Sequence, residues 1–152
     1  MPTIRPAVPA DSDALVRMRL VLWPDHTREW HAGEVGKFFG GRLRMPLAML
    51  VAEDGAGSIT GFVELNIRAY AEGCETDRVA FLEGWYVEER ARRQGIGAAL
   101  VRAAEDWGRA QGCTEFASDA LVDNAVSAEA HKALGFAEVE VIRCFMKRLD
   151  QR

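Results

Sequence analysis

A short basic segment with two glycines has the residue types needed to hold an anion. Residues 92–97 (RRQGIG) stand between the apolar stretch "VAFLEGWYV" and a helical pattern. The first N–H groups of a helix lack partners within it and lie at the positive end of its dipole, so they suit a phosphate. Glycine lets such a ligand approach the backbone, and Arg92 and Arg93 add charged donors. Neither a Walker A loop nor a three-glycine Rossmann fingerprint is present, and a helix start that uses glycine only for close packing is the alternative.

Two carboxylates stand where a charge is unusual. Glu83 interrupts the apolar stretch "VAFLEGWYV", and burying an unpaired charge is costly, so we expect it to face a wet pocket. Asp119 ends the strand pattern "CTEFASD", and strand ends in α/β sheets are common ligand sites, although Asp119 can instead cap a turn. A wider acidic group favours a cationic ligand, and its members are Glu72, Glu75, Asp77, Glu83, Asp119, Asp123, Glu138 and Glu140.

Composition limits the class of protein. The chain has 152 residues, a net charge of −4, 49% hydrophobic and 28% charged residues, which fits one globular domain over residues 1–152. The absence of a basic stripe argues against nucleic acid as a partner, and no apolar run reaches the roughly 20 residues of a membrane helix. No signal peptide and no metal spacing of the three cysteines are evident, so we expect a cytoplasmic protein without a metal.

The hydrophobic periodicity places these residues on alternating strands and helices. Strands are predicted at "TIRPA", "LAMLVAED", "SITGFVELNIRAY", "RVAFLEGWYVEER", "CTEFASD" and "FAEVEVIRCFMKRL". Helices are predicted at "PADSDALVRMRLVLW", capped by Asp11 or Ser12, within "HTREWHAGEVGKFFGG", at "GIGAALVRAAEDWGRAQG" and at "NAVSAEAHKALG". The order β-α-α-β-β-β-α-β-α-β predicts an α/β domain, with a mixed sheet flanked by helices.

The stretch "FLEGWYVEERARRQGIGAALVRAAEDWGRAQGC", with a later asparagine and "HKALGF", resembles the GCN5-related N-acetyltransferases (GNAT). The resemblance implies a mostly antiparallel sheet that splays at strands 4 and 5, and acetyl-CoA as co-substrate. It also implies that the N–H of Val87, in a bulge of strand 4, polarises the thioester carbonyl. The coenzyme site it implies comprises Trp85, Tyr86, Val87, Arg92, Arg93, Gln94, Gly95, Ile96, Gly97, Ala98 and Asn124.

A narrower resemblance concerns the acceptor. "LVLWPDH", "FLEGWYV", "CTEFASDA", "DN" and "H…LGF" look like the aminoglycoside 6′-N-acetyltransferases, which implies antibiotic resistance and a homodimer formed through the C-terminal strand. The implied acceptor site comprises Trp23, His26, Tyr70, Glu83, Asp119 and Glu140. The alternatives are a polyamine, another small amine or a protein N-terminus as acceptor, a non-catalytic acetyl-CoA-binding module, and a monomer. Trp23 and Tyr70 can also be packing residues, and His26 an exposed polar one.

The expected chemistry is direct attack of a free amine on the thioester without a covalent acetyl-enzyme. Glu83 is the first candidate for the base and Asp119 the second, unless they only hold the ammonium group and water takes the proton. His131 stands where many members of the family carry a tyrosine that protonates the leaving thiolate. Imidazole can fill that role as an acid, or His131 can simply form a hydrogen bond on its helix.

Overall fold

The computed structural model describes residues 2–150, which divide into two units. The first ends at Asp119 and the second begins at Ala120, and each is described by itself. Among the described residues, none of the helices has the length and apolarity needed to cross a membrane.

The first unit is built on a five-stranded sheet with the order β1-β2-β3-β4-β5. Neighbouring strands are antiparallel except β4 and β5, which are parallel, as the mixed, mostly antiparallel sheet predicted. The buried side chains of Val51, Phe62 and Leu65 lie in its centre. The strands are β1 Thr3–Pro6, β2 Ala48–Glu53, β3 Ile59–Arg68, β4 Val79–Val87 and β5 Glu115–Ser118.

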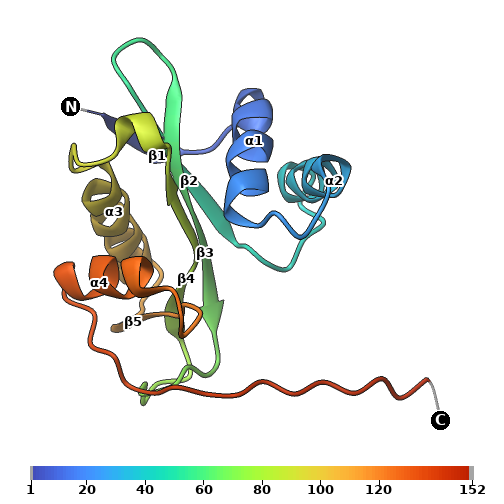
Figure 1. The fold of residues 1–152 in the computed structure, drawn as a ribbon, viewed down its shortest axis with the longest axis vertical. Helices are drawn as coiled ribbons and strands as arrows, with labels where there is room; N and C mark the ends of the chain where they lie inside the picture. The colour runs from blue at the N-terminus through green and yellow to red at the C-terminus, as the bar shows by residue number, and fades with distance from the viewer. Residues whose placement is uncertain (1, 151–152) are drawn as a thin grey trace. The chain divides into compact units, whose positions relative to one another are not determined.

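Helices cover both faces of this sheet. Figure 1 shows α1 and α2 on one face and α3 on the other. An apolar cluster that includes Leu15, Met18, Val35 and Phe62 joins α1 and α2 to the sheet. The helices are α1 Ser12–Leu22, α2 Arg28–Phe39 and α3 Ile96–Ala110, with short 3₁₀ turns η1 Pro9–Asp11 and η2 Glu89–Ala91.

Strand β4 is paired on both sides only over its first half. It pairs with β5 from Val79 to Leu82, whereas its pairing with β3 continues to Val87. The two strands therefore part after Leu82, which agrees with the expected splay. The register of β3 and β4 shifts by one residue, because Leu65 lies opposite Leu82 and Glu64 opposite Gly84.

The extra residue of this bulge is Glu83, so the expectation of a bulge at Val87 was wrong. Side chains alternate along a strand, and Glu64 and Arg68 on β3 share a face. Gly84 lies opposite Glu64, and the Glu83 carboxylate is bonded to Arg68. The bulge thus directs two consecutive residues of β4 toward the face that α1 covers.

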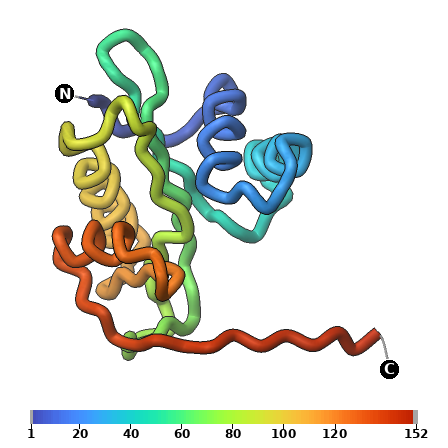
Figure 2. The backbone as a smooth tube through the Cα atoms, in the orientation of Figure 1, coloured from blue at the N-terminus to red at the C-terminus, as the bar shows by residue number. Residues whose placement is uncertain are grey.

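The second unit contains α4, Ala125–Ala133, which the side chain of Asn124 caps by accepting a hydrogen bond from Ser127 N–H at 3.0 Å. The strand predicted at "FAEVEVIRCFMKRL" was wrong, because residues 136–149 are neither strand nor helix. Figure 2 shows this segment as an extended tube. Its apolar residues favour a strand, but a strand needs a neighbour to bond its backbone groups, and the described residues provide none.

Asp11 occupies the N-cap position of α1, but its side chain does not cap the helix as expected. The carboxylate instead accepts two hydrogen bonds from Arg5, at 2.8 and 3.0 Å, and one from Val8 N–H. Asp11 is buried, and the Arg5 guanidinium holds the pKa of its carboxyl below the usual range. This carboxylate ties β1 to the start of α1.

Asp11→Asn is expected to lower the free energy of unfolding at pH 7 by about 2 kcal/mol, the cost of losing hydrogen bonds to a charged group. Because the folded-state pKa is lowered, this contribution is present above the unfolded pKa of about 3.9 and is lost as the pH falls through the folded value. Urea unfolding of both proteins at pH 7 and near pH 3 measures it. The exposed Asp13→Asn is the control, and an equal difference at both pH values would contradict this assignment.

Trp23, at the end of α1, packs on β4 where that strand has no side chain. A Cβ built on Gly84 would lie 2.6 Å from Trp23 Cη2 and 2.9 Å from Cζ2. The indole also meets Phe62 edge to face, with ring centroids 6.4 Å apart. Glycine at position 84 therefore lets the tryptophan ring lie flush with the sheet.

Gly84→Ala is expected to displace the Trp23 ring and to cost about 1–3 kcal/mol of stability, as overpacking of a close contact does. The matched control is Gly33→Ala on α2, where nothing lies within 4 Å of the added carbon. That change is expected to stabilise by about 0.5–1 kcal/mol through the helix preference of alanine. Urea unfolding and tryptophan emission measure both, and equal effects of the two substitutions would refute the packing argument.

Candidate functional site

The glycine loop has the backbone shape of an anion-binding turn. Arg93 and Gly95 both have positive φ, 63° and 80°, and Gly95 is the N-cap of α3. Where residues with positive φ alternate with residues with negative φ, successive backbone N–H groups point to the same side. The first turn of α3 adds N–H groups that have no partners within the helix. Gly97 brings this turn against the indole of Trp85, whose Cζ2 would lie 3.4 Å from an added Cβ. The loop can therefore hold a pyrophosphate with main-chain donors.

The two arginines of the loop differ. Arg92 Nε donates to the carbonyl oxygen of Val87 at 2.8 Å, and its guanidinium lies 5.6 Å from the centre of the Tyr86 ring. Arg92 thus links the loop to the end of β4. Arg93 and Gln94 are exposed on the loop.

The amide of Val87 points toward the side from which β5 has parted. Glu88 N–H donates to the carbonyl of Thr60 at 2.8 Å, so this residue bonds to β3. Hydrogen bonding alternates along an antiparallel pair, and Val87, one residue earlier, therefore directs its N–H away from β3. The contact of this donor with the thioester carbonyl stays a prediction.

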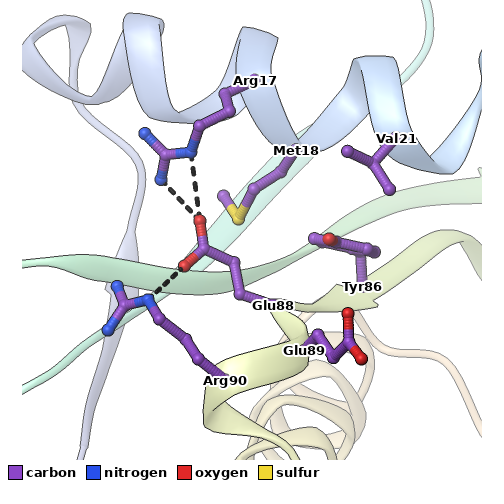
Figure 3. A pocket seen from close by; sticks show the side chains of 7 residues that line it. All are labelled: Arg17, Met18, Val21, Tyr86, Glu88, Glu89 and Arg90. Carbon is purple, nitrogen blue, oxygen red and sulfur yellow. Dashed lines mark hydrogen bonds and ion pairs between the residues drawn. The ribbon is translucent and has the colours of Figure 1, made fainter.

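A cleft of about 480 Å³ lies between α1 and the end of β4. Figure 3 shows Glu88 in it between two arginines, with Glu88 oxygens 2.7 Å from Arg17 Nη2 and 3.0 Å from Arg90 Nε. Of the predicted site residues only Tyr86 lines this cleft, whose lining is Arg17, Met18, Val21, Tyr86, Glu88, Glu89 and Arg90. These ion pairs hold η2, and hence the start of the glycine loop, against α1.

Glu83 lies beside an arginine that sequence analysis did not select. Arg68 Nη2 donates to Glu83 Oε1 at 2.7 Å, and Arg68 Nε donates to Oε2 at 3.0 Å. Asn66 Nδ2 donates to Oε2 at 3.4 Å. The Glu83 carboxylate, with the charges of Asp119 and Glu72, raises the pKa of Arg68 above its usual range, so the direct partner of the predicted carboxylate is a cation.

A buried polar network joins α1, α2 and β3. Arg19 on α1 is paired with Glu64 on β3, and both are about 95% buried. Burial raises the pKa of Glu64, and Arg19 opposes that shift. His31 on α2 accepts from Arg19 Nε through Nδ1 at 3.3 Å and contacts the Trp23 carbonyl through Nε2 at 2.9 Å.

This network positions Trp23. The Arg19 guanidinium lies 4.9 Å from the centre of the Trp23 ring, so both the backbone and the ring of this residue are held. His26 is exposed and stacks on Trp30, with ring centres 3.7 Å apart, and it also meets His31 edge to face at 6.1 Å. The structure thus brings Trp23 and His26 to one place.

The remaining predicted residues lie further along the chain. Tyr70 follows β3 and is 68% exposed, and Asp119 follows β5 and is exposed. Asn124, His131 and Glu140 belong to the second unit. His131 Nδ1 lies 2.7 Å from the carbonyl oxygen of Ser127, so in the neutral ring Nδ1 carries the proton and Nε2 is the acceptor. The acid role of His131 stays a prediction.

Arg68, Arg19, Glu64 and His31 were missed, although three of them carry the signal that selected Glu83. Glu64 and Arg68 are ionisable residues inside or at the end of the apolar strand "ITGFVELNIR", and Arg19 lies among the apolar residues of α1. A charge in such a pattern indicates a partner, but the sequence does not say which one.

Comparison with known proteins agrees with this geometry. Residues 15–136 match the acetyltransferase (GNAT) family. A relative from Klebsiella aerogenes, named aminoglycoside N(6')-acetyltransferase type 1, is 51% identical over 148 residues, which are 97% of this chain and 97% of the relative. One of the same name from Serratia marcescens is 39% identical, with 90% and 92% covered.

Solved structures show the same fold. AAC(6')-Iy in complex with the bisubstrate analog CoA-S-monomethyl-acetylneamine has a TM-score of 0.88 at 32% identity, with 97% of this chain and 99% of that chain covered. The apo aminoglycoside 6'-N-acetyltransferase AAC(6')-IG from Acinetobacter haemolyticus has a TM-score of 0.88 at 36% identity, with the same coverage. The parted β4 and β5, the left-handed turn before α3 and these matches lead to one conclusion: the chain belongs to the GNAT family of acetyltransferases.

Proposed function

We propose that this chain transfers the acetyl group of acetyl-CoA to the 6′-amino group of aminoglycosides. The observation that carries the proposal is the carboxylate of Glu83 on the bulge of β4, directly after Leu82, where β4 and β5 part. Relatives that cover nearly the whole chain are named for this activity, and one similar structure holds a conjugate of CoA and an aminoglycoside fragment. Because acetyl-CoA is made and used inside cells, the proposed place of the reaction is the cytoplasm.

The coenzyme side of the site suits the donor. The left-handed turn at Arg93 and Gly95 and the first turn of α3 offer main-chain N–H groups for a pyrophosphate. Further backbone contacts with the coenzyme would come from Gln94, Ile96, Gly97 and Ala98. Side-chain contacts would come from Trp85 and Tyr86 on β4. Acetyl-CoA, when bound, supplies an activated acyl group as a thioester.

The acceptor side suits a polycation. Glu83, Asp119 and Glu72 concentrate negative charge, which raises the local concentration of a polyamine and orients its ammonium groups. Trp23 packs on Gly84 next to Glu83 and offers an aromatic face there, and we include His26 in the same proposed site. We assign Glu83 the role of holding an ammonium group rather than removing its proton, because both its oxygens already accept N–H donors.

The proposed reaction is a direct displacement. The free amine forms a bond to the thioester carbon, the carbon–sulfur bond breaks, and coenzyme A leaves as a thiolate. Val87 N–H is directed toward the parted strands and would donate to the carbonyl oxygen as it gains negative charge. The proton of the amine passes to water or to the exposed Asp119.

The test is release of free thiol from acetyl-CoA with two acceptors that differ at one atom: neomycin, which has an amino group at the 6′ carbon, and paromomycin, which has a hydroxyl group there. Turnover is expected with neomycin and not with paromomycin. Glu83→Gln is expected to raise KM for neomycin by about tenfold or more, because a hydrogen bond between charged groups becomes a weaker one.

Spermidine and a tetrapeptide amine complete the panel. Turnover on either of them alone would keep the donor and overturn the acceptor. Thiol release with none of the four amines, together with retained acetyl-CoA binding, would favour a non-catalytic acetyl-CoA-binding module. An unchanged KM for Glu83→Gln would remove Glu83 from the acceptor site.

We further propose that the chain forms a homodimer through its C-terminal segment, residues 136–149. Six apolar side chains of this segment are exposed by 55–91%, and extended apolar backbone without a partner strand tends to pair with another chain. The sheet of the first unit ends in the edge strands β1 and β5. The six are Val139, Val141, Ile142, Phe145, Met146 and Leu149.

Light scattering after gel filtration tests the dimer. The wild-type chain is expected to have the mass of two copies. The double variant Val141→Lys with Phe145→Lys is expected to be a monomer, because a charge is costly to bury in a paired apolar strand. Val126→Lys on α4, 83% exposed, is the control and is expected to remain dimeric. A monomeric wild-type chain would overturn the proposal.

A further inference from the structure

Arg68 is the cation that pairs with Glu83. We propose that Arg68 is a positioning residue that commits Glu83 to binding an ammonium group of the acceptor. This inference rests on the proposed function, since it concerns how the same site recognises its acceptor.

The number of hydrogen-bond acceptor positions on Glu83 supports this role. A carboxylate offers about two lone-pair positions on each oxygen. Oε2 accepts from Arg68 Nε at 3.0 Å and from Asn66 Nδ2 at 3.4 Å, so both of its positions are used. Oε1 accepts from Arg68 Nη2 at 2.7 Å, which leaves it one position. Glu83 can therefore receive one further N–H donor at a defined oxygen.

Arg68 is itself held in place, which favours a fixed partner over a cation that the substrate displaces. Its guanidinium lies 3.6 Å from the centre of the Phe81 ring, and Phe81 is 2% exposed. The Glu83 carboxylate, with the charges of Asp119 and Glu72, raises the pKa of Arg68 above its usual range. The fork of an arginine matches both oxygens of a carboxylate, and no other side chain does this in the same way.

The experiment measures kcat and KM for neomycin in Arg68→Met, Arg68→Lys, Glu83→Gln and the double variant Arg68→Met with Glu83→Gln. Arg68→Met is expected to raise KM about tenfold and to change kcat less than about threefold, because binding rather than the chemical step is lost. Arg68→Lys keeps the positive charge but loses the planar guanidinium, and its KM is expected to lie between those of the wild-type chain and Arg68→Met. The double variant is expected to match Glu83→Gln alone, since Arg68 acts through Glu83.

The control is Arg109→Met, which removes an exposed arginine paired with Glu105 and Asp106 on α3 and is expected to leave KM unchanged. A lower KM in Arg68→Met would show that the arginine competes with the substrate, and this would overturn the proposal. The proposal would also be overturned if the effects of Arg68→Met and Glu83→Gln on KM add up in the double variant. A loss of both kcat and folding stability in Arg68→Met would overturn it as well. If Glu83→Gln raises KM and Arg68→Met does not, this inference fails and the proposed acceptor site stands; if Glu83→Gln leaves KM unchanged, the proposed role of Glu83 fails as well.

Discussion

The buried pair of Arg19 and Glu64 is the interaction on which the arrangement of α1, α2 and the sheet depends. Taking two charges out of water costs several kcal/mol for each, and only close pairing and further hydrogen bonds offset that cost. His31 supplies one such bond to Arg19 from the neighbouring helix. Three separate elements must therefore meet at one point, and a shift of α1 or β3 would leave a buried charge without its partner.

That constraint extends to the proposed acceptor region. His31 also contacts the backbone of Trp23, and the Arg19 guanidinium lies near its ring. Gly84 then receives the indole on β4, directly after Glu83. A polar network in the interior, rather than the loop that carries Trp23, thus sets the distance between the aromatic wall and the carboxylate.

Much of this fold follows from the sequence alone. The sequence pattern located the four helices and five strands of the described residues, and it was clearest where an apolar run or an apolar helix face is buried, as in β3, β4 and α3. The prediction of a strand at residues 136–149 was wrong because strand formation depends on a neighbouring strand, and the local sequence pattern does not show whether one is present. The prediction that Asp11 caps α1 was wrong for a similar reason. Its position suits a helix cap, but Arg5, six residues earlier, offers charged donors to the same carboxylate. Glu83 was found as a charge among apolar residues, whereas its partner Arg68 depends on a cross-strand register shifted by a bulge.

The division of labour along β4 has a consequence for how such an enzyme changes over evolutionary time. The proposed contact with the thioester is a backbone amide, which every residue except proline offers, so substitutions at Val87 leave the donor chemistry in place. The proposed acceptor face consists of side chains, including Glu83, Arg68 and Trp23, so a single substitution there is expected to alter which amines bind. Mutational drift can therefore widen or narrow the range of acceptors while the dependence on acetyl-CoA persists.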